Sequence, residues 1–324
     1  MIVVTGAYGF IGSCLIGFLN QHGVEDIIAV DDFSKKYKEP NLTNGVVRER
    51  IGRDIFPHWF EKNAPSVSFV FHLGARTDTA EFDYNVHKKL NLQYSKGIFT
   101  ICVNHSIPII YASSAATYGA GELGYSDLTP SVSFDLKPLN PYGVSKNEFD
   151  KYVLLEKTFP PFWAGLKFFN VYGPNEYHKG RMGSTIWHFY NQIKTKGAVN
   201  LFKSHRPDFA DGEQMRDFIY VKDVLKVMFF LFENYKTLAS GIYNLGTGKA
   251  RTFNDLVRNV FKNLDKPLKI NYVATPEDIR DTYQYFTEAK MDKLNTEGYH
   301  DNFYTLEEGI EDYVQQYLMS NAYF

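Results

Sequence analysis

Short apolar runs alternate along this chain of 324 residues with longer amphipathic stretches. The apolar runs predict strands at residues 2–4, 26–30, 68–73, 107–112, 166–169 and 242–245, and the first amphipathic stretch predicts a helix at residues 10–22. Strands that are apolar at every position are typical of sheets buried on both faces. Strands and helices that alternate in this way predict an α/β fold, a doubly wound parallel (Rossmann) sheet.

The pattern changes after Pro174, where residues 176–215 become rich in His, Lys, Asn and Gly. The apolar sheet pattern returns at residues 218–221 and 242–245, and from residue 252 onward the pattern is helical with one strand near residues 270–273. We therefore expect a dinucleotide-binding domain from residues 1–173 and about 218–247. A smaller, discontinuous substrate-binding α/β lobe is expected from about 174–217 and 248–324.

Composition and charge exclude several classes of function. Apolar residues make up 44% of the chain, and 35 Lys and Arg against 37 Asp and Glu give a net charge of −2, so no overall basic field favours nucleic-acid or membrane partners. Cys14 and Cys102 have neither a CxxC nor a metal-ligand spacing, so we expect no metal site and a reducing compartment. We find neither a signal-peptide pattern nor an apolar run long enough to span a bilayer, and expect a cytoplasmic protein.

Three glycines, Gly6, Gly9 and Gly12, lie directly between the first predicted strand and the first predicted helix. Glycine at these positions permits a tight turn and a close approach of the backbone to a pyrophosphate, which then faces the positive end of the helix. The GxxGxxG spacing in this strand–helix context predicts a dinucleotide site and is typical of short-chain dehydrogenases.

Asp31 ends the second predicted strand, where a carboxylate can accept hydrogen bonds from the adenosine ribose and normally favours NAD. Several cations follow that could instead hold the 2′-phosphate of NADP: Lys35, Lys36, Lys38, Arg48, Arg50 and Arg53. From these residues alone the choice between NAD and NADP stays open.

Tyr142 and Lys146 form a YxxxK pair, which a helix places on one face. A lysine beside the phenol is expected to lower the tyrosine pKa and so to help it exchange protons, and it can also hydrogen-bond the nicotinamide ribose. Ser114 follows the predicted strand 107–112 at the carboxyl edge, where doubly wound sheets bind ligands. Ser114, Tyr142 and Lys146 match the triad of short-chain dehydrogenases in order and in location.

These motifs make the chain similar to the extended short-chain dehydrogenases that act on nucleotide sugars, and most of all to the ADP-L-glycero-D-manno-heptose 6-epimerase family. The resemblance covers nearly the whole chain. It rests on residues 111–119 (YASSAATYG), 138–146 (PLNPYGVSK), 169–174 (FNVYGP), 178–180 (HKG), 216–221 (RDFIYV), 244–248 (NLGTG) and 283–287 (YQYFT). It implies epimerisation at C6 of the heptose, for the supply of lipopolysaccharide core heptose, and a homo-oligomer, with a pentamer as the expected size.

The family uses NADP, and the resemblance implies where this cofactor binds. The chain departs from the family at Asp32, where Asn is usual, and at Arg53, where Lys is expected. The extra negative charge at Asp32 leaves NAD as an alternative. The stretch 121–132 is about four residues longer than in close relatives and is expected to form a surface loop. The implied cofactor positions are Phe10, Ile11, Asp31, Asp32, Lys38, Leu73, Gly74, Ala75, Arg76, Thr77, Asn91, Lys146 and Lys179.

An epimerase of this kind removes a hydride from a carbinol carbon and returns it to the opposite face. The resemblance implies two acid/base residues, Tyr142 for one orientation of the ketone and Lys179 for the other. Arg181 stands where the family has Ser, and could reach phosphate or be solvated. The implied substrate contacts, with Arg216 as the partner of the diphosphate, are Ser114, Asn170, His188, Phe202, Lys203, Ser204, His205, Arg216 and Tyr283.

Three other functions compete with this interpretation. Nucleotide-sugar dehydratases need an acid–carboxylate pair where this chain has Ala115 and Ala116, so dehydration is disfavoured. A UDP-hexose 4-epimerase is the nearest enzymatic rival, and residues 178–180 point away from it. A dinucleotide-binding protein without catalysis commonly lacks the triad Tyr or Lys, and this chain retains both.

Overall fold

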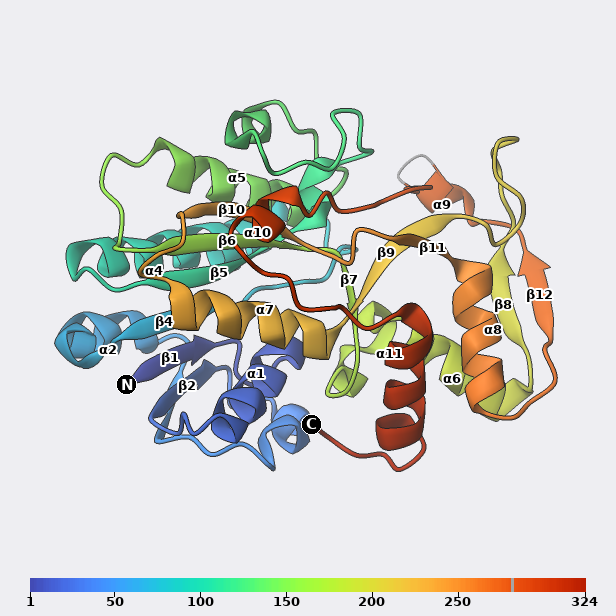
Figure 1. Ribbon diagram of the computed structural model, residues 1–324, viewed down its shortest axis with the longest axis horizontal. Coiled ribbons are helices and arrows are strands. Elements are labelled where there is room, and N and C mark those ends of the chain that lie inside the picture. The colour runs from blue at the N-terminus through green and yellow to red at the C-terminus, as the bar shows by residue number, and fades with distance from the viewer. Residues whose placement is uncertain (281–282) are drawn as a thin grey trace.

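The computed structural model describes residues 1–280 and 283–324, and in this described part the main element is a parallel sheet of seven strands, in the order β10-β6-β5-β4-β1-β2-β3 (Figure 1). The order reverses between β1 and β4, which makes the topological switch point where doubly wound sheets bind ligands. The fold class predicted from the sequence is confirmed. The strands are β1 (Ile2–Thr5), β2 (Ile27–Asp31), β3 (Glu49–Gly52), β4 (Phe69–His72), β5 (Ile109–Ser114), β6 (Trp163–Phe168) and β10 (Gly241–Leu245).

Helices cover both faces of this sheet, and the side chains of each strand divide between two cores. In β1, Ile2 and Val4 belong to the core under α1 (Phe10–Gln21) and α7 (Val221–Asn234), whereas Val3 belongs to the core on the other face. That second core contains side chains of α2 (Phe56–Asn63), α4 (Tyr94–Asn104) and α5 (Pro141–Leu155). Burial on both faces explains why these strands are apolar at consecutive positions.

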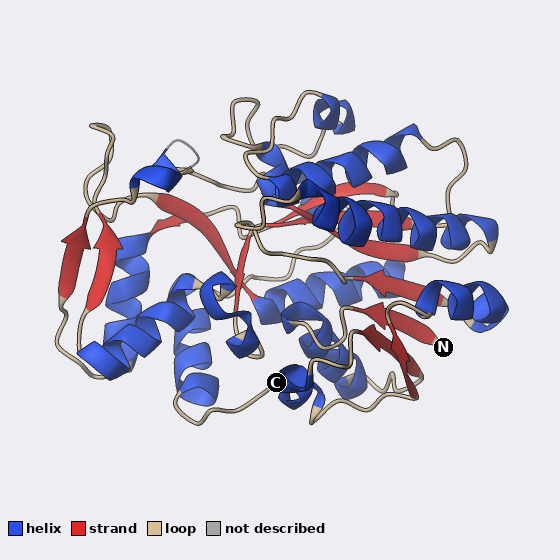
Figure 2. Ribbon diagram, turned by 180° about the vertical axis from the view of Figure 1, so that it is seen from behind, coloured by secondary structure: helices blue, strands red, loops and turns tan. Residues whose placement is uncertain are grey.

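The remaining strands build a smaller lobe beside the carboxyl edge of the sheet (Figure 2). One small sheet has the order β11 (Ala250–Thr252), β9 (Met215–Tyr220), β7 (Asn170–Tyr172), and β12 (Ile270–Val273) pairs with β8 (Val199–Phe202). The lobe also holds the helices α6 (Thr185–Lys196), α8 (Phe253–Asn263), α9 (Glu277–Arg280) and α11 (Leu306–Asp312), with α10 (Asp292–Thr296) lying against β10. The apolar pattern at 218–221 therefore marks a strand of a small sheet and not of the central one.

Short helical segments connect these elements: η1 (Lys36–Leu42), η2 (Ala64–Ser66), α3 (Tyr84–His87), η3 (Lys88–Gln93), η4 (Ala115–Tyr118), η5 (Pro130–Phe134), η6 (Tyr177–Met182) and η7 (Tyr313–Leu318). Strand β3 was not predicted, because Glu49 and Arg50 at the sheet edge are exposed and break the apolar pattern. Within the described residues, no helix is both long enough and apolar enough to cross a membrane.

The stretch 121–132, expected to be a surface loop, is exposed at Glu122 and Leu123 but is tied to the protein further on. The Asp127 carboxylate is buried and accepts a hydrogen bond of 2.6 Å from the Asn244 backbone N–H. The Tyr125 hydroxyl donates to the backbone carbonyl of Phe286 at 2.6 Å. The stretch therefore links the central sheet to the smaller lobe.

Candidate active site

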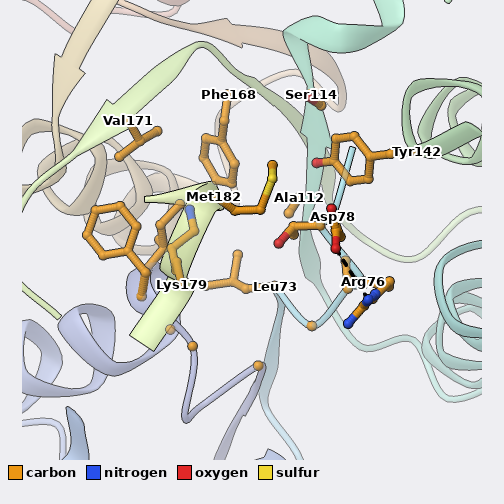
Figure 3. Close-up of a pocket in the computed structure, with 18 of the residues that line it drawn as sticks. Leu73, Arg76, Asp78, Ala112, Ser114, Tyr142, Phe168, Val171, Lys179 and Met182 are labelled. Carbon is orange, nitrogen blue, oxygen red and sulfur yellow. Dashed lines mark hydrogen bonds and ion pairs between the residues drawn. The ribbon is translucent and has the colours of Figure 1, made fainter. Parts of the chain in front are cut away.

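A cavity of about 820 Å³ opens at the carboxyl edge of the central sheet, between the two lobes (Figure 3). The ends of β1, β2, β5 and β6 and the loop that follows β4 contribute to its wall, as the switch-point rule predicts. The sequence-predicted residues that line it are Gly6, Gly9, Phe10, Ile11, Gly12, Asp31, Asp32, Lys38, Arg53, Leu73, Gly74, Ala75, Arg76, Thr77, Ser114, Tyr142, Lys146, Asn170 and Lys179.

The glycine turn brings the N-terminus of α1 to the cavity without a side-chain cap. Gly6 has φ +72°, and a Cβ there would lie 2.8 Å from the Gly74 nitrogen. A Cβ on Gly12 would lie 2.2 Å from the Gly6 carbonyl oxygen. The turn therefore requires glycine at both places, and it leaves the positive end of the helix facing the cavity, where an anion can bind.

The Asp31 carboxylate is fixed at the end of β2 by two backbone donors, the N–H groups of Tyr8 at 2.9 Å and Asp32 at 2.7 Å. Asp32 accepts the Ser34 hydroxyl at 2.5 Å and lies 3.6 Å from the Lys35 ammonium. The Ser34 hydrogen bond lowers the pKa of Asp32, against the effect of burial. Burial lowers the pKa of Lys38, and the charge of Asp31 opposes this shift.

Asn91 lies behind the cavity wall, although the resemblance implies a cofactor contact for it. Its side chain bridges the backbone of Arg76 in both directions, accepting from the N–H at 2.7 Å and donating to the carbonyl at 2.9 Å. It also donates to the Ser145 hydroxyl at 3.0 Å. Asn91 therefore ties the loop after β4 to helix α5, and acts on the cavity through Arg76.

Helix α5 presents Tyr142 and Lys146 to the cavity because Asn140 caps its first turn, accepting from the Gly143 N–H at 2.8 Å, with Pro141 following. The Lys146 ammonium donates a hydrogen bond of 2.6 Å to the Ala112 carbonyl. Burial lowers the pKa of Lys146 to about 8, and the charge of Asp150 opposes this.

Burial raises the pKa of Tyr142, while a hydrogen bond with Ser114 lowers it in part and the charge of Asp150 raises it further. Lys146 does not contribute to this pKa here, because its ammonium is directed at Ala112, and the lowering of the Tyr142 pKa by Lys146 stays a prediction. Ser114 ends β5 and also accepts the Ala116 backbone N–H at 3.1 Å. It thus serves as a helix cap and faces the cavity beside Tyr142 (Figure 3).

Lys179 reaches the cavity from the other side, on the segment η6, with its ammonium 5.3 Å from the centre of the Phe10 ring (Figure 3). Burial lowers the pKa of Lys179, and the negative charge of Glu176 opposes this shift. Between Lys179 and Tyr142 lie Met182 and Asp78. The two predicted acid/base residues therefore face one space from opposite walls.

The remaining predicted substrate residues do not line this cavity and most of them gather in the smaller lobe. The Tyr283 ring lies 6.3 Å from that of Phe202 and 6.2 Å from that of His205, and 5.6 Å from the Arg216 guanidinium carbon. Arg216 is buried and donates to the backbone carbonyls of Met215 and Gln284. Phe253, which lines the cavity, lies 5.9 Å from Arg216 and joins this cluster to it.

The other predicted substrate residues have partners within the chain. The Ser204 backbone N–H donates to Asp211 at 2.8 Å, and that of Lys203 to the Val273 carbonyl at 2.7 Å. A nitrogen of the His188 ring lies 3.3 Å from the Arg181 carbonyl. These three residues flank the Tyr283 cluster or η6 and are not brought to the cavity wall.

Sequence reasoning missed several cavity residues. Asp78, which lines the cavity, accepts two hydrogen bonds of 3.0 Å from Arg181 and lies 3.4 Å from Arg76. Arg181 therefore pairs with a carboxylate of the cavity wall. His178 also lines it, and burial, with Lys38 and Lys179, lowers its pKa to about 4. Across residues 1–280 and 283–324, we find no cluster of side chains suited to a metal ion.

A Rossmann sheet with a dinucleotide turn and a Ser-Tyr-Lys constellation defines a nicotinamide-dependent enzyme of the short-chain dehydrogenase type. A family model described as the NAD dependent epimerase/dehydratase family matches residues 2–246. The chain belongs to this family, and its cofactor is a nicotinamide dinucleotide.

Within the family the similarity is more specific. ADP-L-glycero-D-manno-heptose-6-epimerase of Fusobacterium nucleatum is 47% identical, over 98% of each chain. The solved structure of ADP-L-glycero-D-manno-heptose-6-epimerase from Helicobacter pylori has a TM-score of 0.77 and 28% identity, over 97% of this chain and 95% of that one. Thermus thermophilus UDP-glucose 4-epimerase, solved with NAD, shares the fold at 23% identity, with a TM-score of 0.76 over 97% of each chain. The resemblance drawn from the motifs is confirmed, and the chain is an epimerase.

Proposed function

We propose that the chain interconverts ADP-D-glycero-D-manno-heptose and ADP-L-glycero-D-manno-heptose by oxidation and re-reduction at C6. The observation that carries this proposal is that Tyr142 and Lys179 line the same cavity from opposite walls. The 47% identity to a relative of that name favours this substrate over a UDP-hexose. The product would supply the heptose of the lipopolysaccharide core.

NADP would accept the hydride from C6 and return it within the same turnover. The uncapped N-terminus of α1 suits its pyrophosphate, and Asp31 lines the cavity at the end of β2, where a carboxylate can accept hydrogen bonds from the ribose. Lys35, Lys38 and Arg53 line the same end of the cavity as Asp31 and Asp32. Lys35 pairs with Asp32 and Arg53 with Asp54, whereas Lys38 makes no ion pair within 4 Å among the described residues and is available to an additional phosphate, which is the reason we prefer NADP over NAD.

For one epimer, Tyr142 would take the proton of the C6 hydroxyl as the hydride leaves, with Ser114 holding that hydroxyl. Burial raises the pKa of Tyr142, so the phenol needs a nearby cation to release its own proton near neutral pH. Lys146, one helical turn away, is the cation that can supply this, once its ammonium turns from Ala112 toward the ribose and the phenol.

For the other epimer, the ketone would turn so that its opposite face receives the hydride and its oxygen meets Lys179. A lysine with a lowered pKa gives and takes a proton near neutral pH more readily than an exposed one. Asn170 also lines the cavity. One phenol and one ammonium on opposite walls therefore let each orientation of the ketone find a proton donor.

The nucleotide end of the substrate would lie toward the cluster of Phe202, His205, Arg216 and Tyr283, which offers aromatic faces and a buried guanidinium. For Arg216 to hold the diphosphate, it must exchange the carbonyl of Gln284 for phosphate oxygens. A cytoplasmic location and a homo-oligomer, with the pentamer as the expected size, remain predictions from the sequence and the resemblance.

The test is turnover of the purified protein with ADP-D-glycero-D-manno-heptose and, separately, with UDP-glucose. We expect conversion of the ADP-heptose only, and NADP or NADPH in the supernatant of the denatured protein by mass spectrometry. Conversion of UDP-glucose alone would establish the rival 4-epimerase. Release of NAD alone would contradict the phosphate-binding role of Lys38 and Arg53.

A further inference from the structure

A single buried carboxylate closes the base of the segment that carries Lys179. Glu176 is fully buried, and it accepts hydrogen bonds from the Gly173 backbone N–H at 3.3 Å and the Ser184 hydroxyl at 2.6 Å, together with the Ser184 backbone N–H. The Tyr313 hydroxyl donates to it at 3.0 Å from η7. Glu176 therefore joins both ends of residues 173–184 to each other and to the C-terminal helical segment.

Two of these partners are backbone N–H groups, which can only donate, and they reach different oxygens of the carboxylate, Gly173 one and Ser184 the other, so the site requires a side chain with an acceptor at both positions. An ionised carboxylate meets that requirement, whereas the amide of glutamine would turn an N–H₂ group toward at least one donor. A buried donor left without an acceptor is costly, and the segment would have to shift to relieve the mismatch.

The position of Lys179 depends directly on this closure. Its backbone N–H donates to the Glu176 carbonyl at 2.9 Å, so the turn that begins at Glu176 sets where Lys179 leaves the backbone. Its ammonium lies 5.3 Å from the centre of the Phe10 ring and, among the described residues, makes no ion pair within 4 Å. Among the described residues, the charge of Glu176 opposes the lowering of the Lys179 pKa by burial.

We propose that Glu176 is a positioning residue for Lys179, which holds the turn closed so that the ammonium faces the cavity and supplies the negative charge that balances it. The proposal rests on the proposed function, in which Lys179 exchanges a proton with one of the two epimers. Glu176 contacts neither substrate nor cofactor positions, since it does not line the cavity.

Apart from the cations Lys38 and Lys222, the titratable groups around the pair are neutral near pH 7. Burial holds the pKa of His178 at about 4, with Lys38 and Lys179 contributing. Burial raises the pKa values of Cys14 on α1, of Tyr177 on η6 and of Tyr313 on η7, and the charge of Glu176 adds to each shift. Removal of the Glu176 charge should therefore lower the pKa of Lys179, because these neutral groups cannot replace the lost negative charge.

The first experiment is a single-turnover measurement on Glu176→Gln, in which each epimer is mixed separately with the holoenzyme and cofactor reduction is followed at 340 nm. We expect hydride transfer from the epimer served by Lys179 to slow by about 10²-fold, which is the scale of a small misplacement of a catalytic group. Transfer from the epimer served by Tyr142 should stay within a few-fold of wild type. Equal slowing from both epimers, or from neither, would overturn the proposal.

The second experiment measures the proton affinity of Lys179 without reference to activity. Acetylation of Lys179 by acetic anhydride is followed across pH by mass spectrometry of the peptide. In Glu176→Gln the midpoint should move to lower pH, because loss of the nearby anion disfavours the charged ammonium. An unmoved midpoint would contradict the proposal even if the wild type showed no epimerase activity, an outcome that would separately refute the proposed function.

Two variants separate charge from geometry. Tyr313→Phe removes one hydrogen bond to the carboxylate but keeps its charge, so the labelling midpoint of Lys179 should match that of wild type. Glu176→Asp keeps the charge on a shorter side chain, and it also serves if Glu176→Gln does not fold. In this variant the labelling midpoint of Lys179 should match that of wild type, whereas hydride transfer from the epimer served by Lys179 should still be slower than in wild type. A shifted midpoint in either variant would contradict the assignment of the charge effect to Glu176.

Discussion

Replacement of Lys146 by methionine should remove activity without loss of stability. The lysine is 4% exposed and burial lowers its pKa from 10.5 to about 8. A difference of 10.5 − 8, about 2.5 units, corresponds to about 3 kcal/mol at roughly 1.4 kcal/mol per unit. Below pH 8 the folded protein carries this cost of holding a charged ammonium in its interior.

Methionine has nearly the same length and removes the charge together with its one hydrogen bond, to Ala112. A hydrogen bond of a charged group contributes about 1.5–3 kcal/mol, and its loss offsets most of the stability gained by removing the buried charge. Asp150 keeps its buried partner Lys167 at 2.9 Å, so no unpaired carboxylate remains. We therefore expect a free energy of unfolding between unchanged and about 2 kcal/mol higher at pH 7, with activity lower by about 10²–10⁴-fold.

The pH dependence gives this prediction a second test. Because the folded pKa lies below the unfolded value, the wild-type protein gains stability as pH rises from about 8 toward 10.5, and the methionine variant does not. Urea unfolding of both proteins at pH 7 and pH 10 should show the advantage of the variant shrinking at the higher pH. A loss of more than about 2 kcal/mol at pH 7, or an advantage that grows with pH, would refute the reasoning.

Three further changes test other parts of the site. Tyr142→Phe removes a hydroxyl whose partner is Ser114, and should lower epimerisation by about 10²–10⁴-fold while cofactor stays bound; turnover near the wild-type rate would make Tyr142 only structural. Lys179→Met should lower epimerisation by a similar factor, and activity within a few-fold of wild type at saturating substrate would remove the second acid/base residue from the mechanism. Arg181→Ala breaks the ion pair between the exposed Arg181 and Asp78, and it should change the melting temperature little, since surface pairs contribute about 0–1 kcal/mol. If this pair helps to close the cavity, the variant should have a raised KM for the nucleotide sugar. An unchanged KM would contradict that role.

The central sheet could be predicted from the sequence because burial on both faces leaves a continuous apolar signal. The glycine turn and the Tyr142–Lys146 pair were also readable, because each depends on a short spacing within one element. Strand β3 could not be predicted in this way, since Glu49 and Arg50 are exposed at the edge of the sheet. Strand β9 was recognised as sheet, but its apolar run does not indicate which sheet it joins.

Contacts between distant segments account for the rest of what the sequence did not reveal. Asp78 and Arg181 lie 103 positions apart in the sequence and meet only because the loop after β4 and the segment η6 converge in the fold. Asn91 acts through the backbone of Arg76, and Glu176 through the closure of a turn. Neither the Asp78–Arg181 pair, nor Asn91, nor Glu176 is marked in the sequence by a local pattern. Lys179 itself was predicted only through the family resemblance.

The central claim is that C6 is oxidised and then reduced by the same bound cofactor, and a label at that carbon tests it most directly. ADP-D-glycero-D-manno-heptose with deuterium at C6 is incubated with the purified protein in ordinary water, without added cofactor, and the product is examined by NMR. The account predicts the L-glycero epimer with its deuterium retained at C6. Loss of the deuterium to solvent would indicate proton abstraction and would contradict the account, as would the absence of any L-glycero product.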